Sequence, residues 1–163
     1  MTSSPSMKIK TTNKIQLIIS GGQSGVDRAA LDFSIKHNIP HKGYCPAKRW
    51  AEDGKIDPKY NLIETESSDT SIRTRKNVEL ADATLIIFSM QMDEGTQLTE
   101  AIAKQLKNPF YILNLDRIKK NKFIDWVEQN QISSLNIAGP RESNSPGIYI
   151  SSLEFLESIR DLF

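Results

Sequence analysis

The chain lacks the features expected of an oxidised or membrane-bound protein. It has one cysteine, Cys45, among 163 residues, so no disulfide can form within the chain and a reducing compartment is expected. No apolar run approaches the roughly 18 residues that a membrane-spanning helix requires. The first 13 residues, MTSSPSMKIKTTN, are polar and contain no apolar stretch typical of a secretory signal. These absences predict a cytoplasmic protein with no membrane association.

The chain also lacks an excess of either charge. Lysine and arginine number 21 and aspartate and glutamate 20, which gives a formal net charge of +1. A near-neutral chain creates no general field that concentrates a polyanion, so nucleic acid is not the expected partner. The GxxxxGK[ST] and GxSxG motifs are missing. His37 and His41 lack the acidic or cysteine neighbours that a metal site needs, so we expect no metal site.

Apolar segments of strand length alternate with segments of helical periodicity. Short apolar runs predict strands at residues 15–20, 84–88, 110–115 and 135–138. Strands that alternate with helices predict an α/β protein of the Rossmann type, with a doubly wound, mostly parallel sheet and helices on both faces. We expect a single ligand-binding domain over residues 14–163, preceded by a flexible segment at residues 1–13.

A glycine-rich loop follows the first expected strand. It has the sequence GGQSG and comprises Gly21, Gly22, Gln23, Ser24 and Gly25. Glycine has no Cβ to keep a phosphate from the backbone, and the next helix begins with unpaired amides. We therefore predict that this loop binds a phosphate-bearing small molecule, with hydrogen bonds added by the side chains of Gln23 and Ser24. The alternative is a tight turn that glycine merely permits. Asp27, in the first turn of the helix, is assigned a structural role.

Two further loops leave the ends of expected strands. Gly95 and Thr96 begin another helix, where Thr96 is either a second anion contact or an ordinary cap. Arg141, after the last strand, is the predicted cationic contact. Arg75 is a second candidate, since arginine suits bidentate anion contacts, although a solvated charged face explains it equally well, as it does Lys48 and Arg49. Carboxyl ends of parallel strands share one edge of a sheet, so we expect the loops to face a common ligand.

Three segments of this chain resemble the molybdenum carrier family, and the likeness extends from about Ile15 to Phe163. The segments are IISGGQSGVDRAALD, GYCPAKRWAEDGKI and LNIAGPRESNSPGIY, in the same order. The resemblance implies a Rossmann-like fold, a homo-oligomer, and a non-catalytic protein that stores or transfers the molybdenum cofactor, a phosphate-bearing pterin. Carried over by motif, the cofactor-binding residues are Gly21, Gly22, Gln23, Ser24, Gly25, Gly95, Thr96 and Arg141.

A neighbouring segment is similar to the signature of the phosphoribohydrolases once labelled lysine decarboxylases, which cleave nucleoside monophosphates. Their pattern, PGGxGTxxE, has an acid three residues after the threonine. Here Thr99 occupies that position and Glu100 comes one residue late, about 100° further around a helix. The missing carboxylate weighs against hydrolysis. A nucleotide-processing enzyme with Glu100 or Asp93 as its acid and Arg75 as its anion clamp is the alternative function. A DNA-associated module is a third hypothesis, which the charge balance disfavours.

Overall fold

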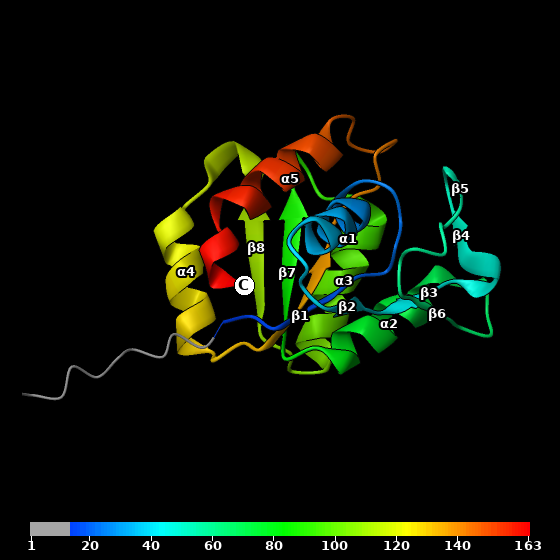
Figure 1. Cartoon of the computed structure of the whole chain (residues 1–163), viewed down its shortest axis with the longest axis horizontal. Coiled ribbons are helices and arrows are strands. Elements are labelled where there is room, and N and C mark those ends of the chain that lie inside the picture. Colours follow the sequence, from blue (N-terminus) through cyan, green and yellow to red (C-terminus); the bar gives the residue numbers. More distant parts are fainter. Residues whose placement is uncertain (1–13) are drawn as a thin grey trace, which may run out of the picture.

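The central sheet has five parallel strands in the order β2-β1-β9-β7-β8 (Figure 1). The computed structural model describes residues 14–163, and the segment at 1–13 lies outside the described residues. The strands of the sheet are β1 (Leu17–Ile19), β2 (His41–Lys42), β7 (Ala83–Phe88), β8 (Phe110–Asn114) and β9 (Ser134–Ala138). All four longer predicted strands are confirmed. The last strand in the chain, β9, lies between β1 and β7.

Helices cover both faces of this sheet, as Figure 1 shows. One face carries α1 (Val26–Lys36), α4 (Lys120–Gln129) and α5 (Ile148–Ser158). The other face carries α2 (Thr70–Leu80) and α3 (Glu94–Gln105). The predicted doubly wound α/β fold is therefore confirmed. No helix within residues 14–163 is long and apolar enough to span a bilayer.

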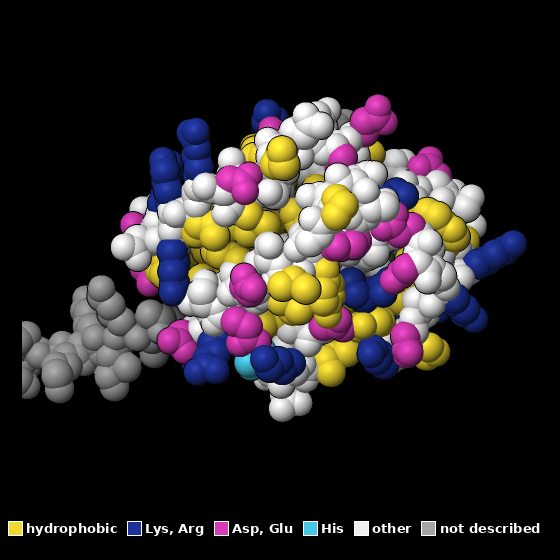
Figure 2. Space-filling model, turned by 90° about the horizontal axis from the view of Figure 1, so that it is seen from above, with side chains coloured by type: hydrophobic (Ala, Val, Ile, Leu, Met, Phe, Trp, Pro, Cys, Tyr) yellow, Lys and Arg dark blue, Asp and Glu magenta, His cyan; other side chains and the backbone are white. Residues whose placement is uncertain are grey.

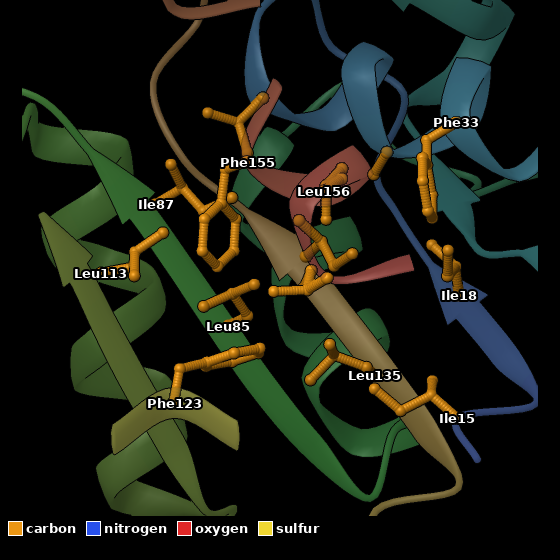
Figure 3. Close-up of a cluster of buried hydrophobic side chains, with 14 of the residues drawn as sticks. Ile15, Ile18, Phe33, Leu85, Ile87, Leu113, Phe123, Leu135, Phe155 and Leu156 are labelled. Atoms are coloured by element: carbon orange, nitrogen blue, oxygen red, sulfur yellow. The ribbon is translucent and has the colours of Figure 1, made fainter. Parts of the chain in front are cut away.

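The core explains why the strands are readable as continuous apolar runs. In β7, Leu85, Ile86 and Ile87 are all fully buried, because each face of the sheet is covered by helices. Leu85 and Ile87 belong to the cluster that includes Phe123 of α4 and Phe155 of α5 (Figure 3). The opposite face has a smaller cluster around Val78, Ile102 and Ala103. Two short helices, η2 (Leu115–Arg117) and η3 (Arg160–Leu162), complete this part of the chain.

Between β2 and α2 the chain leaves the central sheet. This excursion contains two short strand pairs and a helical turn: β3 (Tyr44–Cys45) with β6 (Ile63–Glu64), β4 (Trp50–Ala51) with β5 (Gly54–Lys55), and η1 (Ala47–Arg49). The Arg49 guanidinium donates to four carbonyl oxygens of the same excursion, those of Ile56, Asp57, Tyr60 and Leu62. Arg49 therefore holds the excursion together, with four of its five N–H donors used within the protein.

Candidate functional site

The three predicted loops meet around one cavity. They follow β1, β9 and β7, which are adjacent in the sheet, so their carboxyl ends lie side by side. The cavity has a volume of about 740 Å³, which is within the range of small-molecule sites. Of the predicted site residues, it is lined by Gly21, Gln23, Gly95, Thr96 and Arg141. The expectation that loops distant in sequence face a common space is thus met.

Four predicted residues lie elsewhere. Ser24 and Gly25 line a second cavity on the other side of the glycine-rich loop. Gly22 packs against the excursion, where a Cβ would lie 2.6 Å from Cδ1 of Leu62. Arg75 is on the outer side of α2, where its Nη2 donates to Oε1 of Gln105 at 2.7 Å. The structure therefore separates the predicted set into a group at the first cavity and a group outside it.

The glycine-rich loop uses most of its own amides. Four of the six amides from Gly21 to Val26 donate to partners within the protein: Gly22 to Ser20 Oγ, Gln23 to Asp27 Oδ2, Ser24 to Gln23 Oε1, and Val26 to the carbonyl of Pro140. An amide that is already paired offers no donor to a phosphate. The loop therefore differs from the open cradle of amides that its sequence predicts, and side chains must provide most contacts to a ligand.

Glycine is required at position 25 because the loop after β9 packs closely against it. Its φ is +80°, and a Cβ at this position would lie 2.3 Å from the carbonyl oxygen of Pro140. The neighbouring Ser24 Oγ accepts a hydrogen bond from the amide of Glu142 at 3.1 Å. These contacts lock the loop after β1 to the loop after β9. The close approach that glycine permits here is to protein backbone.

Arg73 provides a buried cation on the floor of the first cavity. Arg73 is only 9% exposed and lines the cavity, and its Nη1 donates to the carbonyl of Gly21 at 2.8 Å. A guanidinium has five N–H donors. Among residues 14–163, no further acceptor and no carboxylate pairs with it. Burial lowers the pKa of Arg73, and the charge of Asp27 opposes that shift.

Sequence reasoning selected Arg75 instead of Arg73. Two residues correspond to about 200° around a helix, so the two arginines point in nearly opposite directions. The buried residues of α2 are Arg73, Asn77 and Val78. Their spacing follows the helical repeat, but two of the three are polar, so an apolar stripe could not reveal the inner face. The spacing of Arg73 and Asn77 was the available signal.

Asp27 lies beside Arg73 and also lines the cavity. It is 7% exposed, and burial raises its pKa to about 6, against the lowering effect of Arg73. Oδ2 accepts the amide of Gln23 at 3.2 Å, and no donor within the described part of the chain contacts Oδ1. A Cβ on Gly21 would lie 2.8 Å from Arg73 Nη1 and 3.1 Å from Asp27 Oδ2. The structure therefore gives Asp27 a place in the cavity that sequence reasoning did not.

The donors of Thr96 at the start of α3 are used by the N-terminal cap of the helix, Asp93. Asp93 Oδ1 accepts hydrogen bonds from the amide of Thr96, at 2.9 Å, and from its hydroxyl. Asp93 Oδ2 accepts from Nδ2 of Asn144 at 2.9 Å. Burial would raise the pKa of Asp93, but these hydrogen bonds outweigh it and the pKa lies below its ordinary value. Thr96 thus donates its hydroxyl proton to the cap.

Arg141 lies at the rim of the first cavity. Its side chain is 35% exposed, and its guanidinium lies 4.0 Å from Oε2 of Glu52. The ring centroid of Trp50, in β4, is 5.8 Å away. These contacts hold Arg141 between the excursion and the loop after β9. On the face seen in Figure 2, lysine and arginine side chains are interspersed with aspartate and glutamate side chains.

The residues assigned to a nucleotide-processing enzyme do not assemble here. Glu100 is absent from the residues that line the cavity and lies 3.8 Å from Nζ of Lys104. Thr99 lines the cavity in its place, and Arg75 is outside. Asp93 does line the cavity, where it serves as the cap of α3. The proposed acid and anion clamp of this alternative therefore do not meet.

The sequence profile of the circularly permutated YpsA SLOG family matches residues 18–160. The chain belongs to this family. The matched region includes all three loops of the cavity, and the family's Rossmann-like fold agrees with the observed sheet. A solved structure from Syntrophus aciditrophicus, named "putative molybdenum carrier protein", is 46% identical over 88% of this chain and 94% of that one, with a TM-score of 0.86. Comparison with curated proteins gives no match.

Proposed function

We propose that the first cavity binds the molybdenum cofactor, a phosphate-bearing pterin, and that the protein stores or protects it for transfer. The observation that carries this proposal is the Arg73 guanidinium, which is buried and uses one donor within the described residues. Taking a cation out of water costs free energy unless acceptors surround it. A ligand with acceptor oxygens would supply them. We propose as well that the protein is cytoplasmic and that it forms a homo-oligomer, as the family resemblance implies.

The cavity also fits the size and polarity of such a ligand. Arg141 at the rim is a second guanidinium, and guanidinium groups bind phosphate through two parallel hydrogen bonds. The volume of about 740 Å³ accommodates a fused ring with a phosphate-bearing side group. The name of the Syntrophus protein supports a molybdenum cargo. A carrier needs these binding groups and no acid–base pair, which accords with the absence of Glu100 from the cavity.

The test is retention of the cofactor by purified protein. Wild-type protein is equilibrated with molybdenum cofactor, freed of unbound ligand, and analysed for bound molybdenum and for bound pterin by fluorescence. R73M should lower the affinity about a hundredfold, because two charge-assisted hydrogen bonds are lost. R75M is the matched control, since it removes the same side chain from the outer side of the same helix, and it should bind like wild type.

Two results would contradict the proposal. One is a wild-type protein that retains neither molybdenum nor pterin. The other is equal loss of affinity in R73M and R75M, which would indicate a general effect of positive charge. Circular dichroism of both variants shows whether α2 and the rest of the fold are intact.

A further inference from the structure

The floor of the first cavity presents an acceptor and a donor side by side. Arg73 Nη1 and Asp27 Oδ2 both lie within about 3 Å of the position that a Cβ on Gly21 would take, at 2.8 and 3.1 Å. Yet Arg73 and Asp27 form no ion pair. Each keeps hydrogen-bonding capacity that no described residue uses: Oδ1 of Asp27 and most N–H groups of Arg73.

Asp27 lines the cavity and is held by a hydrogen bond from the glycine-rich loop. The amide of Gln23 donates to Oδ2, which leaves Oδ1 as the open oxygen. Gln23 is itself fixed, because its Oε1 accepts the amides of Ser24 at 3.0 Å and Glu52 at 2.9 Å. The carboxyl group of Asp27 is therefore oriented by a chain of hydrogen bonds from two loops. Gln23 acts here as a positioning residue.

This arrangement disfavours a phosphate on the floor. A phosphate beside Arg73 would also lie beside the Asp27 carboxylate, and two negative groups at that separation repel strongly where water is excluded. A neutral group that both accepts and donates hydrogen bonds satisfies the two side chains together. The phosphate of the ligand is better placed at the rim, near Arg141.

We propose that Asp27 and Arg73 recognise the amino-lactam edge of the ligand ring. In this edge a ring carbonyl is followed by a ring N–H and then by an exocyclic amino group. Arg73 donates to the carbonyl oxygen, and Asp27 Oδ1 accepts from the N–H and amino groups. The inference rests on the proposed function, in which this cavity holds a pterin. The same edge occurs in guanine, so the experiment includes both kinds of ring.

The experiment measures affinities of matched ring pairs by fluorescence and calorimetry. The first pair is 6-hydroxymethylpterin and 6-hydroxymethyllumazine, in which a carbonyl replaces the 2-amino group. The second pair is guanosine and inosine 5′-monophosphates, of which the latter lacks that amino group. Wild-type protein should prefer the pterin to the lumazine by about tenfold or more, since the lumazine keeps the ring N–H but replaces the amino donor by a carbonyl oxygen that repels the Asp27 carboxylate.

The variant D27N tests the role of Asp27 itself. Its amide oxygen can still accept from the Gln23 amide, while the amide nitrogen turns a donor toward the ligand's donors. The preference for pterin over lumazine should therefore disappear. D32N is the matched control, because Asp32 lies on the same helix and lines the second cavity, and it should keep the wild-type preference. Equal affinities of wild-type protein for pterin and lumazine, or an unchanged preference in D27N, would overturn the inference.

The two proposals fail separately. Retention of the molybdenum cofactor without any preference between pterin and lumazine refutes the recognition by Asp27 and leaves the carrier function standing. A pterin preference in a protein that retains no cofactor supports the recognition and refutes the carrier. Tighter binding of guanosine than of inosine monophosphate, with both tighter than hydroxymethylpterin, supports the edge recognition and assigns the site to a nucleotide instead.

Discussion

The glycine-rich loop separates two cavities of similar size that differ in how their charges are paired. The second cavity, about 630 Å³, is lined by Arg28, Asp32, Glu52 and Asp53 among others. There, Arg28 forms an ion pair with Asp53 at 2.9 Å, and Glu52 accepts the hydroxyls of Ser24 and Ser143. In the first cavity Arg73 and Asp27 keep open donors and acceptors. Unused hydrogen-bonding capacity, rather than volume, distinguishes the first cavity from the second.

Asp32, in the second cavity, has both carboxylate oxygens hydrogen-bonded to other side chains of the protein. Its two oxygens accept the hydroxyls of Tyr60, from the excursion, and Tyr149, from α5. Burial and the hydrogen bond to Asp32 raise the pKa of Tyr149 to about 12, and the pKa of Tyr60 is raised for the same reasons. Both hydroxyls therefore keep their protons at neutral pH. This cluster joins α1, α5 and the excursion.

Substitution of the residue between the two cavities should have the largest effect. G25A places a Cβ 2.3 Å from the Pro140 carbonyl in a backbone with φ of +80°. We expect a loss of about 3–4 kcal/mol in the free energy of unfolding, measured with urea. G54A is the control, because Gly54 has φ of +116° but no atom within 4 Å of its Cβ position. It should lose about 1 kcal/mol. Equal losses would show that backbone strain alone requires glycine.

The buried carboxyl of the first cavity should make stability depend on pH. The pKa of Asp27 is about 6 in the folded chain, against an ordinary value of 3.8. Between these values the folded state binds more protons than the unfolded state, so the free energy of unfolding falls as pH rises from about 4 to 6. Above pH 6 the folded state bears the full cost of ionising the buried Asp27 carboxyl, on the order of 2–3 kcal/mol of unfolding free energy.

D27N removes this titration. Relative to wild type, the variant should gain on the order of 2–3 kcal/mol as pH is raised from 4 to 7, by urea unfolding at each pH. The difference between the two proteins cancels the other groups that titrate in this window. A difference that does not vary with pH would mean that Asp27 titrates at its ordinary pKa.

In the second cavity, the same type of substitution should lower the free energy of unfolding. D32N weakens the hydrogen bonds from Tyr60 and Tyr149 and should cost about 1–2 kcal/mol of unfolding free energy. Its affinity for the molybdenum cofactor should remain within about twofold of wild type, because none of its contacts faces the first cavity. Loss of cofactor affinity in D32N without loss of stability would reverse the roles assigned to the two cavities.

The sheet could be predicted from the sequence because its strands are buried on both faces. The run TLIIF is apolar at nearly every position, and β7 spans Ala83–Phe88 accordingly. The excursion could not be predicted in the same way. Its strands are two residues long, as at Trp50–Ala51 and Gly54–Lys55, which is too short for any periodicity to show. Its structure depends on the Arg49 side chain, which contacts carbonyls of the same excursion that follow no regular spacing.

The site could be predicted at the level of loops but not of atoms. Strand ends place Gly21, Gly95 and Arg141 around one cavity, as topology requires. The partner of each amide depends on residues far along the chain, as when the carbonyl of Pro140 accepts from Val26. The sequence places Arg73 in a basic cluster with Arg75 and Lys76 that could face one anion, but the inner face of α2 is polar, so no hydrophobic pattern indicated which arginine points inward.

The position of β9 affects when the sheet can form during synthesis of the chain. The middle of the sheet is filled by a strand that begins at Ser134, and the wall formed by Gly139 and Arg141 follows it. A growing or truncated chain therefore has β1 and β7 but nothing to join them. Contacts between such distant segments form slowly. The first cavity is therefore complete only after β9 and the loop that follows it have been synthesised and have joined the sheet.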